Sequence, residues 1–255
     1  MPGPLPGAGS PARAVAALGL IAWVGSAACP SPLDAQSPVE GEVRQLVTFR
    51  LLPGRSAEVS EIFREQALPL YERNEAMLSF RGFREVESPV ALDLIVVSAF
   101  RGMAGMDDSN EALRSLAAER GTSIGGVYGS IAAASSGHDD QFVEMLAHLS
   151  HGDASDRPLV ALVWYRLLPG EGGRFERTLG DRIVPWERET GTPSATGRFL
   201  VSDGWHYLRF LGFASLADYH AYWKGVDAEG HDYLDGITAV RREVIVAPVP
   251  ELSVR

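Results

Sequence analysis

The chain has 255 residues, of which 45% are hydrophobic and 22% are charged, a balance typical of a globular protein with a full core. This composition excludes a disordered or collagen-like chain, and a single cysteine excludes a disulfide scaffold. The formal net charge of −10 argues against binding to nucleic acid, because contact with a phosphate backbone requires a basic face.

The first 35 residues have the pattern of a secretory signal peptide. Arg13 precedes an apolar run at 14–24, and small residues follow that run. A helix needs about 20 residues to cross a bilayer, so the run is too short to span one. No other segment is long and apolar enough to be a membrane span. We therefore expect an exported protein of the periplasm or the extracellular space.

Two cleavage sites fit this signal. Cleavage after Ala28 would leave Cys29 as the first residue, as in a membrane-anchored bacterial lipoprotein. Cleavage after Ala35 would discard Cys29 with the signal. The second is favoured, because a lipoprotein signal usually has an aliphatic residue where this chain has Ser26. With either site the folded part has no cysteine, which excludes disulfides and thiol catalysis there.

The rest of the chain contains an internal repeat. Residues 46–69 match residues 162–185 without a gap, including the shared Leu-Leu-Pro-Gly at 51–54 and 167–170. A helical stripe of apolar residues recurs at the same places in both copies: Val59, Phe63, Ala67 and Leu70, then Phe175, Leu179, Ile183 and Trp186. Each copy therefore begins with a strand, a Pro-Gly turn and an amphipathic helix.

The later elements also run in parallel. Strands are predicted at 93–100 and 206–213, helices at roughly 107–120 and 215–224, and closing strands at 142–147 and 243–247. The first copy carries an acidic, Gly/Ala-rich insertion near 108–140. Its segment 121–137 is either a closely packed helix or a mobile flap. The resulting order is a linker at 36–43, a first repeat at 44–150, a linker at 151–156 and a second repeat at 157–255.

This series of elements, with the later helix entered at Phe-x-Ser, resembles the NIPSNAP and antibiotic-biosynthesis-monooxygenase-like families. The resemblance covers about 44–150 and again 157–253. It implies an α+β fold in which two tandem ferredoxin-like repeats pair their antiparallel sheets into an intramolecular α+β barrel. In those families two chains usually form the barrel. Here the expectation is a monomer with an internal pseudo-dimer, and further oligomerisation stays open.

The chain departs from these families at their functional positions. The monooxygenase pattern has a histidine late in the second helix, where the nearest counterpart is Tyr222, with His220 two places earlier. The Asn-Trp-His set of the haem-degrading relatives is not recognisable. Neither activity can be transferred residue by residue.

Strand alternation predicts which side chains point into the barrel. In the opening strands, Val47 and Val163 are assigned to the helix side, which turns Thr48 and Trp164 inward. In the later strands, Ile95, Val97, Leu208 and Phe210 are assigned to the helix side, which turns Tyr207 and Arg209 inward. The predicted ligand pocket therefore consists of Arg209, Tyr207, Trp164, Arg166, Arg50, Thr48 and His206.

The arginines have an alternative interpretation. A buried charge needs a partner, so Arg209 is expected to pair with a ligand anion or with a protein acid such as Asp203 or Glu187. Arg50 and Arg166 lie near strand ends, where they could pair with acids or carbonyl groups at the rim.

The histidines do not predict a metal site. His148 and His151 have a ligand-like spacing but lie at a linker, and metal sites usually show tighter clusters. No metal and no other cofactor is predicted. His206 and His231 are the only histidines considered for a haem-binding or catalytic role. There is no Ser-His-Asp set, phosphate-binding loop or dinucleotide motif.

Three functions remain open. The first is an exported small-molecule-binding or accessory protein with a barrel pocket lined by arginine and aromatic residues. The second is a cofactor-independent monooxygenase or isomerase acting on a small aromatic or phenolic substrate, as the family resemblance suggests. The third is a haem-binding protein. The sequence leaves open whether the protein is an enzyme.

Overall fold

The computed structural model describes residues 38–86, 93–228 and 234–254. The predicted signal peptide, its cleavage sites, Cys29 and His231 lie outside these residues. Within the described part of the chain, no helix is long and apolar enough to cross a membrane.

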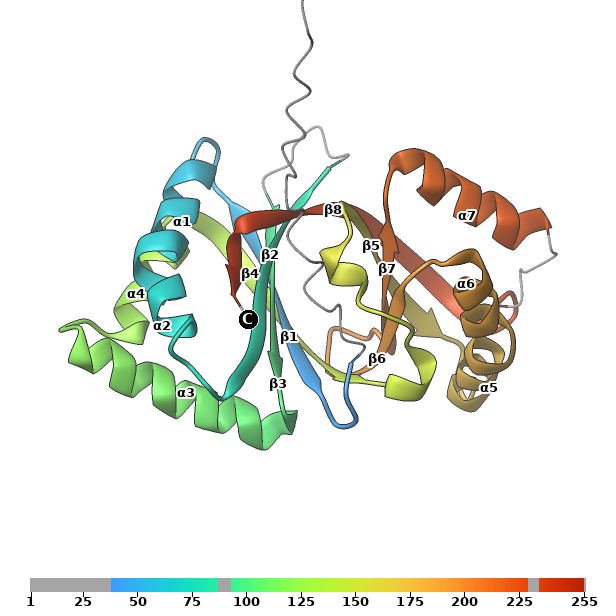
Figure 1. The fold of residues 1–255 in the computed structure, drawn as a ribbon, viewed down its shortest axis with the longest axis horizontal. Helices are drawn as coiled ribbons and strands as arrows, with labels where there is room; N and C mark the ends of the chain where they lie inside the picture. The colour runs from blue at the N-terminus through green and yellow to red at the C-terminus, as the bar shows by residue number, and fades with distance from the viewer. Residues whose placement is uncertain (1–37, 87–92, 229–233, 255) are drawn as a thin grey trace, which may run out of the picture. The chain divides into compact units, whose positions relative to one another are not determined.

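Eight strands of the described residues form a closed barrel (Figure 1). Their order around the barrel is β1-β3-β2-β8-β5-β7-β6-β4, and every pairing is antiparallel. The strands are β1 (Val43–Leu51), β2 (Met77–Glu85), β3 (Asp93–Phe100), β4 (Ser135–Met145), β5 (Leu159–Leu167), β6 (Ser194–Val201), β7 (Tyr207–Phe213) and β8 (Thr238–Val254).

The barrel consists of two equivalent four-stranded sheets. The first has the order β4-β1-β3-β2, and the second has the same order as β8-β5-β7-β6. The β2–β8 and β4–β6 pairings join the two sheets, so each half satisfies the strand edges that the other would leave exposed. The predicted intramolecular barrel of two ferredoxin-like repeats is confirmed.

Helices cover the outer faces of the two sheets on opposite sides of the barrel (Figure 1). The first half has α1 (Ser56–Ile62), α2 (Leu68–Tyr71), α3 (Gly102–Glu119) and α4 (Ile124–Ala133). The second half has α5 (Gly172–Thr178), α6 (Val184–Thr190) and α7 (Leu216–Ala228).

Both copies of the repeat contain the same irregularity of the helical backbone. A π-helical turn follows α1 at Phe63–Ala67, and another follows α5 at Leu179–Ile183, at equivalent places in the two copies. Pro69 and Pro185 come just after these turns and have no N–H for the regular i→i−4 bond. The widened turn accommodates the missing bond in both halves.

Several elements differ from the sequence prediction. Strands β2 and β6 were not predicted, and β4 and β8 begin earlier than their predicted counterparts at 142–147 and 243–247. The glycine-rich segment 121–137 forms α4 and the start of β4, so it contains a helix. That helix is buried at Val127 and Ile131 and not through its glycines, since no atom lies within 4 Å of a Cβ at Gly125 or Gly129.

Apolar side chains fill the barrel interior. This cluster includes Leu46, Phe83, Ile95, Val97, Val143, Leu162, Trp164, Leu208 and Phe210. Each sheet also has one apolar cluster between it and the helices that cover it. The fold therefore has three cores, one inside the barrel and one beneath each helical layer.

The predicted strand faces are correct for β1 and β5 and wrong for β3 and β7. Leu208 and Phe210 lie inside the barrel, so Tyr207 and Arg209 lie on the helix side. Register explains the outcome: Arg209 is paired with Val163 of β5, and directly paired residues share a face of the sheet. All seven residues of β7 are buried, so polarity could not indicate which face was which.

Candidate functional site

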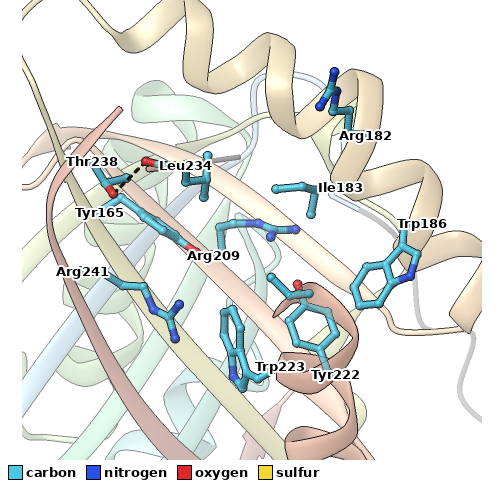
Figure 2. Close-up of a pocket in the computed structure, with 11 residues that line it drawn as sticks. Tyr165, Arg182, Ile183, Trp186, Arg209, Tyr222, Trp223, Leu234, Thr238 and Arg241 are labelled. Atoms are coloured by element: carbon cyan, nitrogen blue, oxygen red, sulfur yellow. Dashed lines mark hydrogen bonds between the residues drawn. The ribbon is translucent and has the colours of Figure 1, made fainter. Parts of the chain in front are cut away.

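A pocket of about 120 Å³ lies in the second half, between its sheet and helices α6 and α7 (Figure 2). Its sheet side includes Tyr165 of β5, Arg209 of β7 and Arg241 of β8. The described residues that line it are Tyr165, Arg182, Ile183, Trp186, Arg209, Tyr222, Trp223, Val226, Leu234, Thr238 and Arg241.

A buried ion pair forms one side of this pocket. Arg209 Nη2 donates to both carboxylate oxygens of Glu187 on α6, at 2.8 and 2.7 Å, and Arg209 Nε donates to Thr196 Oγ1 at 3.2 Å. Glu187 also accepts hydrogen bonds from the hydroxyl groups of Ser194 and Tyr222, both at 2.6 Å. Burial disfavours the charge on Arg209, but attraction to Glu187 outweighs it and raises the pKa of the guanidinium.

Two hydrogen-bond donors of the pocket have no partner among the described residues. Arg209 uses Nε and Nη2 for its bonds, which leaves the two hydrogens on Nη1. The Tyr165 hydroxyl makes no hydrogen bond with a described residue, and in Figure 2 the Tyr165 ring points toward Arg209. Both residues line the pocket. They are therefore placed to donate to an oxygen atom of a ligand.

The Tyr165 hydroxyl keeps its proton at neutral pH. Burial raises the pKa of this phenol, although Arg209 and Arg241 both act to lower it. The side chain therefore serves as a hydrogen-bond donor and not as a base.

A second arginine of the sheet side, Arg241, contacts an aromatic ring of the helix side. The Arg241 guanidinium carbon lies 3.8 Å from the centre of the Trp223 ring, a cation–π contact. Both side chains also bond Glu243: Arg241 Nη2 donates at 2.7 Å and Trp223 Nε1 at 3.2 Å. Arg241 and Arg182 are exposed, so two guanidinium groups line the pocket where it reaches the surface.

The pocket is better suited to stabilising an anion than to removing a proton. None of the described lining residues is histidine, cysteine, aspartate or glutamate. Glu187 borders the pocket, but its two oxygens accept bonds from Arg209, Ser194 and Tyr222. A cation, a phenolic hydroxyl and aromatic walls match a small aromatic molecule that carries a negative charge on oxygen.

Of the seven predicted site residues, only Arg209 lines this pocket. Its predicted position inside the barrel is wrong. Of the partners left open for it, a ligand anion or a protein acid such as Asp203 or Glu187, the structure shows Glu187. Tyr207 also lies on the helix side, where its hydroxyl donates to Glu176 at 2.6 Å.

The other five residues lie elsewhere on the barrel. Trp164 lies inside it and donates to Gln141 at 3.0 Å, and Thr48 is paired with the inward-facing Ile95. The remaining three interact around the strand ends: Arg50 pairs with Asp139, Arg166 donates to the carbonyl oxygens of Gly204 and Asp203 at 3.0 and 3.2 Å, and the exposed His206 accepts from the Leu167 amide at 2.8 Å.

The site residues missed from the sequence, such as Trp186 and Tyr222, resemble ordinary core residues there. The missing signal is a difference between the repeats. Arg209 is paired with Val163 and Val96 is paired with Val47, so Val96 is the first-half counterpart of Arg209. By the offset of the repeat, Tyr71 is the counterpart of Glu187. Both counterparts belong to the apolar core of the first half, so the buried ion pair is specific to the second.

Solved structures share this architecture. A protein provisionally assigned as a monooxygenase, from Lactobacillus acidophilus NCFM, matches with a TM-score of 0.61 and 12% identity over 84% of this chain and 96% of its own. An anthrone oxidase-like protein matches with a TM-score of 0.56 and 11% identity over 85% and 94%. The chain has the dimeric α+β barrel fold.

Haem proteins share this barrel fold as well. A haem-binding protein from Thermus thermophilus matches with a TM-score of 0.50 and 13% identity over 86% of this chain and 96% of its own. At these identities the likeness concerns the fold. No family model and no curated protein matches the sequence.

Haem does not fit the pocket that the described residues form. None of the lining residues in this part of the chain is histidine, cysteine or methionine. Ligation by tyrosine requires an ionised phenol, and burial raises the pKa of both Tyr165 and Tyr222. The pocket of about 120 Å³ is also smaller than the roughly 300–1,000 Å³ typical of pockets for larger ligands.

Proposed function

We propose that the protein is a cofactor-independent monooxygenase that binds a small, single-ring phenolic compound as its anion. The observation that carries this proposal is a pair of donors, Arg209 Nη1 and the Tyr165 hydroxyl, that bond none of the described residues and lie in an aromatic-walled pocket. The names of the structural neighbours, which include a provisionally assigned monooxygenase and an anthrone oxidase-like protein, support the same reaction class.

The size of the pocket supports a single ring. An engineered protein cavity of about 150 Å³ holds benzene. The pocket of about 120 Å³ is close to that size, and its mouth is open toward the exposed Arg182 and Arg241. A fused three-ring compound exceeds this volume, so the proposed substrate is monocyclic.

The chemistry proposed for this pocket begins with ionisation of the ligand. A free phenol has a pKa of about 10, and a nearby cation lowers such a value by about 1–3 units. Glu187 balances the charge of Arg209, so the phenolate is favoured through the hydrogen bonds that Arg209 Nη1 and the Tyr165 hydroxyl donate to its oxygen, without a protein base. The Tyr165 hydroxyl donates to the same oxygen or to the oxygen adduct that forms next.

The bound phenolate is the electron donor in the oxygenation. It transfers an electron to O₂, and the resulting pair combines at the para carbon of the ring as a peroxide. The peroxide takes up a proton, equivalent to the one that the phenol released to solvent on ionisation. Loss of water, which also removes the hydrogen of the para carbon, then leaves a quinone, so one oxygen atom of O₂ stays on the ring and the other leaves in water. The role of the protein is to hold the anion and to limit access of water to the adduct.

Oxygen consumption tests this proposal directly. Purified protein is incubated with phenol, 2-hydroxybenzoate and 3-hydroxybenzoate, whose para carbons carry the hydrogen that loss of water requires, while dissolved oxygen and quinone absorbance are followed. We expect uptake with at least one single-ring phenol and a rate at least tenfold lower in Tyr165→Phe. Tyr207→Phe is the matched control, because its hydroxyl bonds Glu176 and lines no part of the pocket. Absence of oxygen uptake with every phenol contradicts the proposal.

Binding without chemistry is the second candidate function. It is favoured by the lack of histidine, cysteine, aspartate and glutamate among the described lining residues. Calorimetric titration with 4-hydroxybenzoate separates the two functions. Binding that depends on Arg209 but is accompanied by no oxygen uptake supports a small-molecule-binding protein.

Export is part of the same proposal. It rests on the signal-peptide pattern of residues 1–35, which lie outside the described residues. Mass spectrometry of protein from its native host gives the mature N-terminus. A first residue of Gln36 supports a released protein, a lipid-modified Cys29 supports an anchored one, and an intact N-terminus at Met1 contradicts export.

A further inference from the structure

Two aromatic side chains stand between the pocket and a second hollow. This hollow has a volume of about 290 Å³ and lies beside the end of β7 and the start of α7. Trp186 and Tyr222 line both spaces. The other residues of the hollow are Arg157, Thr190, Gly191, Thr192, Gly212, Phe213, Ala214, Asp218 and Ala221.

The two side chains are held in different ways. Tyr222 is fixed through its hydroxyl, which donates to the buried carboxylate of Glu187 at 2.6 Å. Trp186 packs its ring against Tyr222, with the ring centres 5.0 Å apart, and against the backbone of Gly225 on α7. A Cβ atom at Gly225 would lie 2.9 Å from Trp186 Cζ2, so the glycine is what lets the indole lie this close to the helix.

We propose that Trp186 is a specificity-determining residue that sets the upper size limit of the ligand. This inference rests on the proposed occupant of the pocket, a single-ring aromatic anion. In Figure 2, Trp186 and Tyr222 lie beyond the guanidinium of Arg209, on the side that borders the second hollow. Removal of the indole joins the two spaces, while Tyr222 keeps its bond to Glu187.

The joined space fits a two-ring compound with a polar group at each end. The anionic oxygen occupies the Arg209 end, as in the single-ring ligand. The far end offers the hydroxyl groups of Thr190 and Thr192, which lie 3.2 Å apart, and the exposed cation of Arg157. A hydroxynaphthoate has this arrangement of two fused rings and two oxygen substituents.

Calorimetric titration with 4-hydroxybenzoate and 6-hydroxy-2-naphthoate tests the size limit. We expect the wild-type protein to bind the benzoate at least tenfold more tightly than the naphthoate. In Trp186→Leu and Trp186→Ala, affinity for the naphthoate relative to the benzoate rises at least tenfold, although the lost ring contact weakens binding of the benzoate itself. Leucine is well tolerated in this fold, because Leu70 occupies the equivalent position of the first half.

Trp205→Ala is the matched control. Trp205 is half-buried and lies under the Arg166 guanidinium, but it lines neither space. Its removal should leave both affinities unchanged. If Trp205→Ala raises naphthoate affinity relative to the benzoate as much as the Trp186 variants do, the effect is a general loosening and the inference is overturned.

A crystal structure of Trp186→Leu separates this inference from the proposed function. The inference requires one continuous cavity in the variant, whether or not a ligand binds. If neighbouring side chains fill the vacated space, or if the cavity is joined but naphthoate affinity relative to the benzoate does not rise, the inference is overturned. If the wild-type protein fails to bind 4-hydroxybenzoate while the cavity of the variant is joined, the proposed ligand class is wrong and the role of Trp186 as the partition stands.

Discussion

Arg209 on β7 and Glu187 on α6 form an ion pair in which neither side chain is more than 1% exposed. The pair connects the sheet to the helix at one side of the pocket, and it fixes which nitrogen of Arg209 is available to a ligand. Removing two charges from water is costly, so such a pair adds little net stability. Replacing only one of the two residues is nevertheless destabilising, because the charge of the other is then left buried without a partner.

Replacing Arg209 with leucine should destabilise the protein by about 3–5 kcal/mol, because Glu187 would lose its cation. The double variant Arg209→Leu/Glu187→Leu should recover at least half of that loss. Recovery is incomplete, because the Ser194 and Tyr222 hydroxyls lose their acceptor. Urea-induced unfolding measures all three proteins.

Arg188→Leu provides the control for this experiment. Arg188 is adjacent to Glu187 in sequence but is exposed, so its replacement should change stability by no more than about 0.5 kcal/mol. If the single variant Arg209→Leu is as stable as the wild-type protein, the Glu187 carboxylate is not buried in the way that the structure indicates.

The sequence predicts the architecture better than the site. The repeat and its helical stripes indicate the tandem barrel, and the requirement for a buried cation to have a partner points to Glu187 as one of two candidate acids. The strand containing Arg209 is buried on both faces, so alternation alone assigns its side chain to the wrong one. Only the pairing of Arg209 with Val163 resolves the face, and a register of this kind is a tertiary property.

The strand β6 was missed in the sequence for a related reason. β6 begins with the small residues Ser194, Ala195, Thr196 and Gly197, which give little hydrophobic alternation. The last of them, Gly197, allows close contact with β4, so a residue that weakens the strand signal in the sequence lies where the two halves join.

The stability of the fold should decline between about pH 10 and pH 12 through Tyr207. Burial and the hydrogen bond to Glu176 raise the pKa of this phenol to about 12 in the folded protein. The unfolded chain releases the proton near pH 10, so the contribution of Tyr207 is fully present below pH 10 and is lost as the pH rises to 12. Thermal melts across this range should show a shallower decline in Tyr207→Phe. Identical slopes in the two proteins would contradict a raised pKa.

Each half should depend on the other for solubility. Residues 36–156 expressed alone would expose the inward face of the first sheet, which includes Leu46, Phe83, Ile95 and Val143. We expect a homodimer, in which a second copy replaces the missing half, or an insoluble product. Size-exclusion chromatography with light scattering measures the outcome. A soluble monomer with a sharp cooperative melt would show that the shared barrel core is not required for folding.

The seam between β4 and β6 should be intolerant of a single added methyl group. A Cβ atom at Gly197 would lie 2.5 Å from Val143 Cγ1 and 3.1 Å from the carbonyl oxygen of Glu144, and backbone cannot yield as a flexible side chain can. Gly197→Ala should therefore cost about 1–3 kcal/mol of unfolding free energy.

Gly129→Ala on α4 is the matched control, because no atom lies within 4 Å of its added Cβ. Alanine is favoured over glycine in a helix by about 0.5–1 kcal/mol, so this variant should be more stable than the wild-type protein. If Gly197→Ala is stabilised to the same extent, the two halves are not in close contact at this seam, and the barrel would be held together mainly by the β2–β8 pairing.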